Sequence, residues 1–103
     1  MFRRRRFSEV ISRQLELFER EHADVIEECD ELERAYHTAP RDEAEERYGD
    51  YVDAVETGTE ILADIRDHFK WTLDDDTGEL YEEEFNREVL KRLPRFALEI
   101  ENR

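Results

Sequence analysis

Glu19 and His22 form the first pair in this sequence whose types and spacing suggest chemistry. Three residues apart, a carboxylate and an imidazole lie on one face of a helix. Such a pair supplies two ligands for iron, manganese or zinc when neighbouring helices add further carboxylates. Glu19 and His22 are therefore the candidate metal ligands, provided that acids of another helix point toward them.

The acids that would complete this site fall on the wrong face of the next predicted helix. They occupy heptad positions that face outward, and they are Asp53, Glu56, Glu60 and Asp64. We therefore expect no bound metal and no other cofactor. A ferritin-like metal-binding bundle built on this pair is kept as an alternative function.

A second metal motif would need two copies of the chain. His22 and Cys29 are one heptad apart, so a dimer could offer zinc two histidines and two cysteines. Within one chain the two residues are separated by about 10 Å along the helix axis, which is too far for one ion. We expect both to be core residues.

The acidic segment 74–78 fits part of a 12-residue calcium-binding loop. With Gly78 in the sixth place, four other places hold acceptable residues, namely Asp75, Thr77, Leu80 and Glu84. The first place needs an aspartate and holds Leu73. A simpler interpretation is an acidic turn in which Asp76 or Thr77 caps the next helix. The sequence contains no catalytic triad pattern and no glycine-rich phosphate loop, so we expect no enzyme activity.

Two long heptad runs dominate the sequence. One comprises Ile11, Leu15, Phe18, His22, Val25, Cys29, Leu32 and Tyr36, and the other comprises Ala44, Tyr48, Tyr51, Val55, Gly58, Leu62, Ile65, Phe69 and Thr72. Steps of four and three place each run on one helix face, a seam that packs against a facing helix. Only seven residues, including Pro40, separate the runs, so the sequence predicts an antiparallel helical hairpin. A bend near Pro40 places His22 opposite Gly58.

The predicted fold class is all-α, with residues 1–103 in one domain. The predicted parts are a basic N-terminal arm over 1–7, helices over 8–37, 41–73 and 79–93, and a tail over 94–103. Ser8 is the expected N-cap of the first helix. The third helix is expected to cover the open end of the hairpin, where extra apolar residues such as Leu17 and Ile61 lie off the seam. Alternating apolar residues favour an extended tail, and a short helix is the other interpretation.

Composition limits the possible partners. The net charge is −14, and 45% of the residues are charged. This sign argues against nucleic-acid binding, which needs a basic face. The sequence has neither an apolar segment of transmembrane length nor a secretory signal, so we expect a cytoplasmic protein without a membrane partner.

Two features predict contact with other proteins. The N-terminal arm contains four consecutive arginines, namely Arg3, Arg4, Arg5 and Arg6. We expect them to pair with the acidic face of a second copy or of another protein; a lipid surface ranks second as their partner, and nucleic acid third. Tyr36, Tyr48 and Tyr51 lie near the turn, where the short third helix does not reach. A two-helix hairpin buries too little surface alone, so we expect self-association, with a dimer as the simplest form.

The leading functional hypothesis is thus a non-enzymatic acidic interaction or assembly module that acts as a homo-oligomer. The alternatives are the metal-binding bundle and an acidic mimic of nucleic acid that occupies a basic protein partner.

Overall fold

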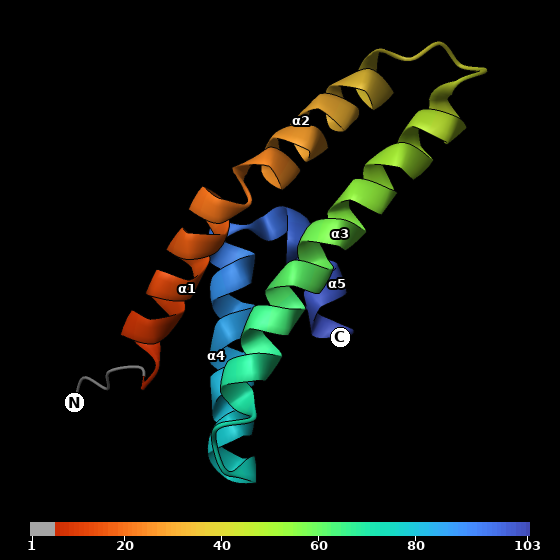
Figure 1. Ribbon diagram of the computed structural model, residues 1–103. Helices are drawn as coiled ribbons and strands as arrows, with labels where there is room; N and C mark the ends of the chain where they lie inside the picture. The colour runs from red at the N-terminus through yellow and green to blue at the C-terminus, as the bar shows by residue number, and fades with distance from the viewer. Residues whose placement is uncertain (1–5) are drawn as a thin grey trace.

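The computed structural model describes residues 6–103, and this part of the chain is helical with no strands (Figure 1). In chain order its elements are α1 (Ser8–Glu21), α2 (Ala23–Thr38), α3 (Ala44–Lys70), α4 (Asp75–Arg92), the 3-10 helix η1 (Pro94–Phe96) and α5 (Ala97–Glu101). The predicted all-α class is confirmed. None of these helices is long and apolar enough to cross a membrane.

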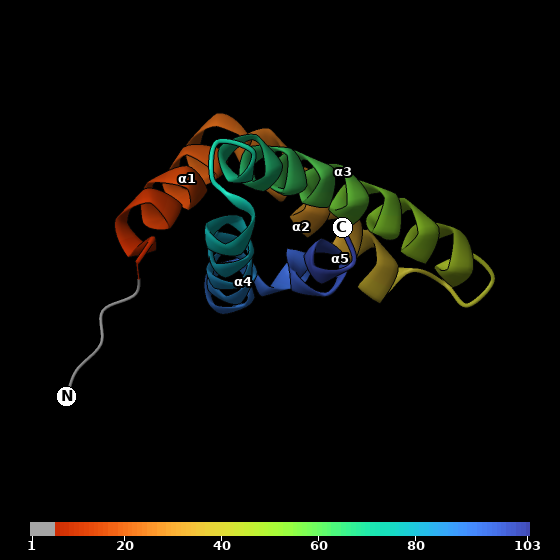
Figure 2. The ribbon, with the colours of Figure 1, turned by 90° about the horizontal axis from the view of Figure 1, so that it is seen from below.

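The helices form two layers of unequal length. In Figure 1, α2 and α3 run side by side toward the turn, whereas α1 diverges from α3 and α4 lies between their lower ends. Seen from below in Figure 2, α4 and α5 lie under α1 and α3. The molecule measures 53 × 27 × 23 Å. We call residues 23–57 the stalk, and residues 6–22 together with 58–103 the base.

The helix predicted over 8–37 is wrong, because the chain bends at His22. This residue leaves helical geometry with φ −121° and ψ 32°, and its N–H closes α1 by donating to the Phe18 carbonyl at 2.9 Å. Below the bend, α1 buries Ile11, Leu15 and Phe18 toward α4; above it, α2 packs on α3. Since α4 separates α1 from α3, one straight helix could not follow both partners.

The core of the base is rich in aromatic rings. The Phe7 ring lies 5.4 Å from that of Tyr81 and 6.3 Å from that of Phe69. The Phe7 N–H also donates to Glu84 Oε2 at 3.2 Å. This anchoring makes Phe7 the N-cap residue, so α1 begins at Ser8 and the predicted cap at Ser8 is wrong.

The acidic segment after α3 starts a helix earlier than predicted. The Asp74 side chain accepts the Thr77 N–H at 2.8 Å, which makes Asp74 the N-cap of α4 in place of Asp76 or Thr77. This hydrogen bond holds the pKa of Asp74 below its ordinary value. Because α4 begins at Asp75, the residues proposed for a calcium loop lie in a helix, and that interpretation is wrong.

The tail is helical, so the extended interpretation is wrong and the short-helix alternative holds. In η1 and α5, Phe96 and Ile100 are buried one turn apart while Leu98 stays 75% exposed. The Phe96 ring fills the space over Gly58, where a Cβ atom would collide with it. Gly58 is therefore buried by Phe96, and the predicted pairing of Gly58 with His22 is wrong.

Candidate functional site

An apolar groove lies between α1 and α3 in the base. It has a volume of about 630 Å³, and its lining comprises Gln14 of α1, five residues of α3 and one residue just after α3, namely Ile61, Asp64, Ile65, His68, Phe69 and Thr72. Concave apolar surfaces with few polar groups are the usual binding sites of proteins. The groove is therefore the candidate functional site.

Tyr81 of α4 is fully buried and contacts two of the lining residues. Its hydroxyl donates to Gln14 Oε1 at 2.8 Å, and its ring lies 4.8 Å from the ring of Phe69. Burial raises the pKa of Tyr81 above its ordinary value, so the hydroxyl stays protonated as a donor. Tyr81 therefore links Gln14 of α1 to Phe69 of α3.

The groove is a part of the predicted seam that α1 does not cover. Ile65, Phe69 and Thr72 belong to the heptad run expected to face the first helix. In the structure α1 diverges, and the fully buried face of α3 in the base turns to Leu62 and Arg66, which face α4 and α5. Residues with core spacing are thereby left at the surface.

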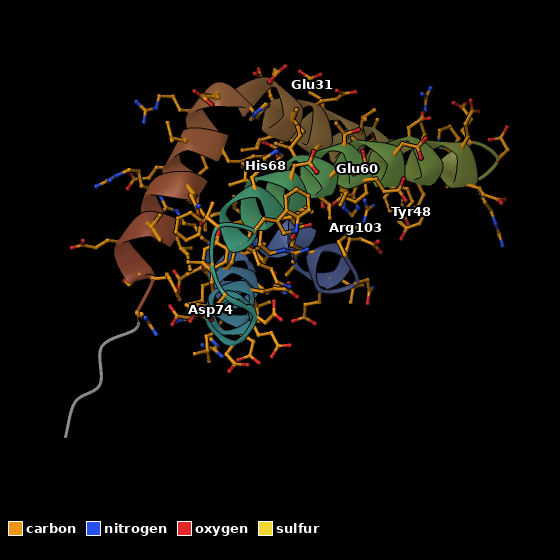
Figure 3. The ribbon with its side chains drawn as sticks, turned by 60° about the horizontal axis from the view of Figure 1, so that its bottom comes forward. Glu31, Tyr48, Glu60, His68, Asp74 and Arg103 are labelled. Carbon is orange, nitrogen blue, oxygen red and sulfur yellow. The ribbon has the colours of Figure 1, made fainter. Side chains whose placement is uncertain are left out.

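Large apolar side chains continue beyond the lining. On α1, Leu17 follows Gln14 by three positions and is 39% exposed. At the end of α3, the Trp71 ring lies 5.6 Å from that of His68 and is 75% exposed. Figure 3 shows His68 at the base end of α3, far from Tyr48. Leu17 and Trp71 thus add exposed apolar side chains on the two helices that border the groove.

The three tyrosines predicted as interaction residues have different surroundings. The rings of Tyr36 and Tyr48 pack together at 5.1 Å, and Tyr48 is half exposed. Tyr51 is instead covered, because Arg95 Nε donates to its hydroxyl at 3.2 Å. Of the three, only the pair near the turn is left as an exposed aromatic contact.

Arg95 ties the C-terminal segment to the stalk, which the sequence did not indicate. Its Nη2 lies 2.9 Å from Asp30 Oδ1 and 3.0 Å from Glu33 Oε1. Burial lowers the pKa of Arg95, but the bonds to Tyr51 and Asp30 outweigh it and raise the pKa overall. Nearby, Cys29 is fully buried, and this burial raises the pKa of its thiol. The cover in this part of the hairpin thus comes from the tail and not from the third predicted helix, and Tyr48 stays exposed.

A second arginine, Arg66, is fully buried at the junction of three helices. Its Nη1 donates to Asn86 Oδ1 and to the Ile100 carbonyl, both at 3.0 Å, and its Nε donates to Asp67 Oδ1 at 2.9 Å. Its Nη2 is buried with no hydrogen-bond partner among residues 6–103. Arg66 lies four residues after the buried Leu62, on the same face of α3. This spacing is the sequence signal that indicates its burial. Its bonds fix α4 and α5 on α3.

The predicted metal pair gains no further ligand in the described part of the chain. Glu19 Oε1 lies 3.0 Å from Arg92 Nη2, and the His22 ring lies 5.6 Å from that of Phe18. Among residues 6–103, no three His, Cys, Asp or Glu side chains are grouped to hold a metal ion.

The N-terminal arginines are mostly beyond what the structure describes. Arg3, Arg4 and Arg5 lie outside the described residues, so their predicted role is untested. Arg6 is exposed, with its guanidinium 5.8 Å from the centre of the Phe7 ring.

Compared with known proteins, the chain matches no family model, no curated protein and no solved structure.

Proposed function

We propose that this protein is a non-enzymatic helical interaction module that works as a homodimer and uses the groove between α1 and α3 as its contact surface. The observation that carries the proposal is the open groove, in which Ile61 and the seam residues Ile65 and Phe69 are only partly buried. Removing such a surface from water is favourable by about 25 cal/mol per Å². Contiguous exposed apolar surface usually marks an interaction site.

The polar groups of the groove support binding better than catalysis. Gln14 accepts from Tyr81, and His68 Nδ1 lies 2.8 Å from the Asp64 carbonyl oxygen. Both side chains are thus engaged with the protein itself. The groove consequently offers a partner mainly apolar contact.

Sedimentation equilibrium at micromolar concentrations tests the proposal. We expect a mass of about twice the 12.5 kDa chain. A monomer at high micromolar concentration would contradict it. Elemental analysis of the same sample tests the alternative, since a ferritin-like bundle would retain stoichiometric iron, manganese or zinc after dialysis against a chelator.

A second candidate function is recognition of a basic protein by the stalk. Residues 23–57 contain 13 acidic and 3 basic side chains, whereas the remaining 68 residues contain 17 acidic and 13 basic side chains. The stalk thus carries −10 of the −14 net charge. Binding of a lysine-rich peptide should fall when Glu27, Glu31, Glu45 and Glu46 become Gln. A matched change of Glu9, Glu16, Glu79 and Glu83 should have less effect.

A further inference from the structure

We infer that two copies dock groove to groove in a crosswise manner, with α1 of each copy against α3 of the other. The inference rests on the proposed homodimer and adds the orientation of its two chains. It follows from the charges that border the apolar surface.

The α1 edge of the groove is positively charged. Arg13 and Arg20 lie four residues before and three after Leu17, so they flank it on the same helix face. Both are exposed, and neither has an ion-pair partner among residues 6–103. Glu21, the last residue of α1, lies at the far end of this edge.

The α3 edge carries the opposite charge. Asp64 lines the groove, and its carboxylate has no ion-pair partner in the described part of the chain. Glu60 lies one turn earlier on α3 and forms an ion pair with Arg103 at 3.4 Å (Figure 3). Asp64 thus leaves an unpaired negative charge on this edge, opposite in sign to Arg13 and Arg20.

Only one of the two simple symmetric arrangements uses this complementarity. A two-fold axis across the groove would place the two α1 helices against each other, and arginines would meet arginines. A two-fold axis along the groove places α1 against α3 twice, because an isologous interface repeats every contact. Opposite charges that meet at the edge of an interface set its orientation, and like charges oppose it.

The same arrangement covers the exposed apolar side chains. Leu17 of one copy lies over the α3 lining of the other, and Trp71 lies at the border of the joined surface. Buried aromatic and aliphatic anchors dominate the binding energy of protein interfaces. Trp71 is the only tryptophan in the sequence, so its fluorescence reports on this region without a label.

The first test places a charge inside the groove. Ile61→Arg and, separately, Leu17→Arg should each raise the dimer dissociation constant about 100-fold, since each change occurs twice in the dimer. Leu98→Arg is the matched control, because Leu98 lies on α5 and is 75% exposed. We expect this control to dimerise as the original chain does. Circular dichroism confirms that each variant stays helical.

The second test exchanges the charges of the two edges. One variant carries Arg13→Glu and Arg20→Glu, and the other carries Asp64→Lys. Each variant alone should dimerise about 3- to 10-fold more weakly than the original chain, since like charges then meet. Mixing the two variants should restore affinity in a heterodimer, which is measured by fluorescence anisotropy with one labelled variant.

The outcomes separate the inference from the proposed function. If the original chain is a dimer and the groove variants dimerise equally well, the crosswise dimer and the use of the groove as its contact surface are both overturned, and only the homodimer itself stands. If the groove variants fail but the charge variants behave like the original chain, the crosswise orientation is overturned. If the original chain is a monomer, both proposals fail.

Discussion

The stalk and the base share α3 but use it differently. In the stalk, α3 packs mainly on α2, with Arg95 of η1 bonded to Tyr51, and the buried residues are only Cys29, Ala54 and Val55. In the base, α3 meets α4 and α5, and all the buried aromatic side chains of residues 6–103 lie there. A second layer of helices thus gives large side chains a place to be buried.

Charge follows the same division. The stalk carries −10 in 35 residues, whereas the rest of the chain sums to −4. A hairpin exposed on most of its surface has few core positions, so its remaining positions are free to hold acids. We infer that the base provides most of the free energy of folding and supports the stalk. Substitutions matched between the two regions test that division.

The largest expected effect is the loss of Phe96, a buried residue in the core of the base. Its ring covers Gly58 and lies 5.8 Å from that of Phe18. Phe96→Ala should lower the free energy of unfolding by about 3–5 kcal/mol, because it leaves a cavity in the core. Urea denaturation measures the loss.

Tyr48→Ala is the matched change in the stalk. Because Tyr48 is half exposed and its ring packs on that of Tyr36, we expect a loss of about 1 kcal/mol or less. Equal losses for the two variants would contradict the division between base and stalk.

The second prediction contrasts two glycines of α3. Gly58→Ala should lower the free energy of unfolding by about 1–3 kcal/mol, because the new Cβ collides with Phe96. A Cβ on Gly49 would meet no atom within 4 Å, so Gly49→Ala should raise stability by about 0.5–1 kcal/mol through helix propensity. Thermal melts measure both shifts, and a higher melting temperature for both would show that Phe96 does not pack on Gly58.

Helix periodicity predicted much of this fold because apolar residues recur wherever two helices meet. It gave the all-α class and the approximate positions of the helices. It could not predict the bend at His22, which carries neither proline nor glycine and follows from the position of α4. It also placed Gly58 on a buried face but gave it the wrong neighbour, since Phe96 is 38 residues away in the sequence.

For the same reason, the sequence predicts the candidate site only in part. Leu17 and Ile61 were seen as apolar residues off the seam, but they were expected under the third helix. Periodicity shows which residues share a face, and it does not show which partner covers that face. The contacts of Arg95 with Asp30 and Glu33 cannot be predicted from the sequence, because ion pairs between distant residues produce no local sequence pattern.

The third prediction concerns the tie between the tail and the stalk. Arg95→Gln removes the ion pairs with Asp30 and Glu33 and should cost about 1 kcal/mol, since both partners are largely exposed. Amide hydrogen exchange should become faster in the stalk and change little in the base. Arg103→Gln, which removes only the exposed pair with Glu60, is the control. Uniformly faster exchange would mean that Arg95 supports the whole fold.

The smallest expected effect is that of salt on the proposed dimer. In the crosswise arrangement both stalks project in the same direction, which brings two regions of charge −10 near each other. Raising NaCl from about 0.1 M to about 1 M shortens the Debye length from about 10 Å to about 3 Å, which screens this repulsion. The same salt weakens the contacts of Arg13 and Arg20 with Asp64, so we expect the dimer to tighten only a few-fold. The four stalk substitutions of Glu to Gln should reduce this dependence, and the matched base substitutions should reduce it less. A dimer that weakens with salt would show that the charges at the groove edges outweigh those of the stalk.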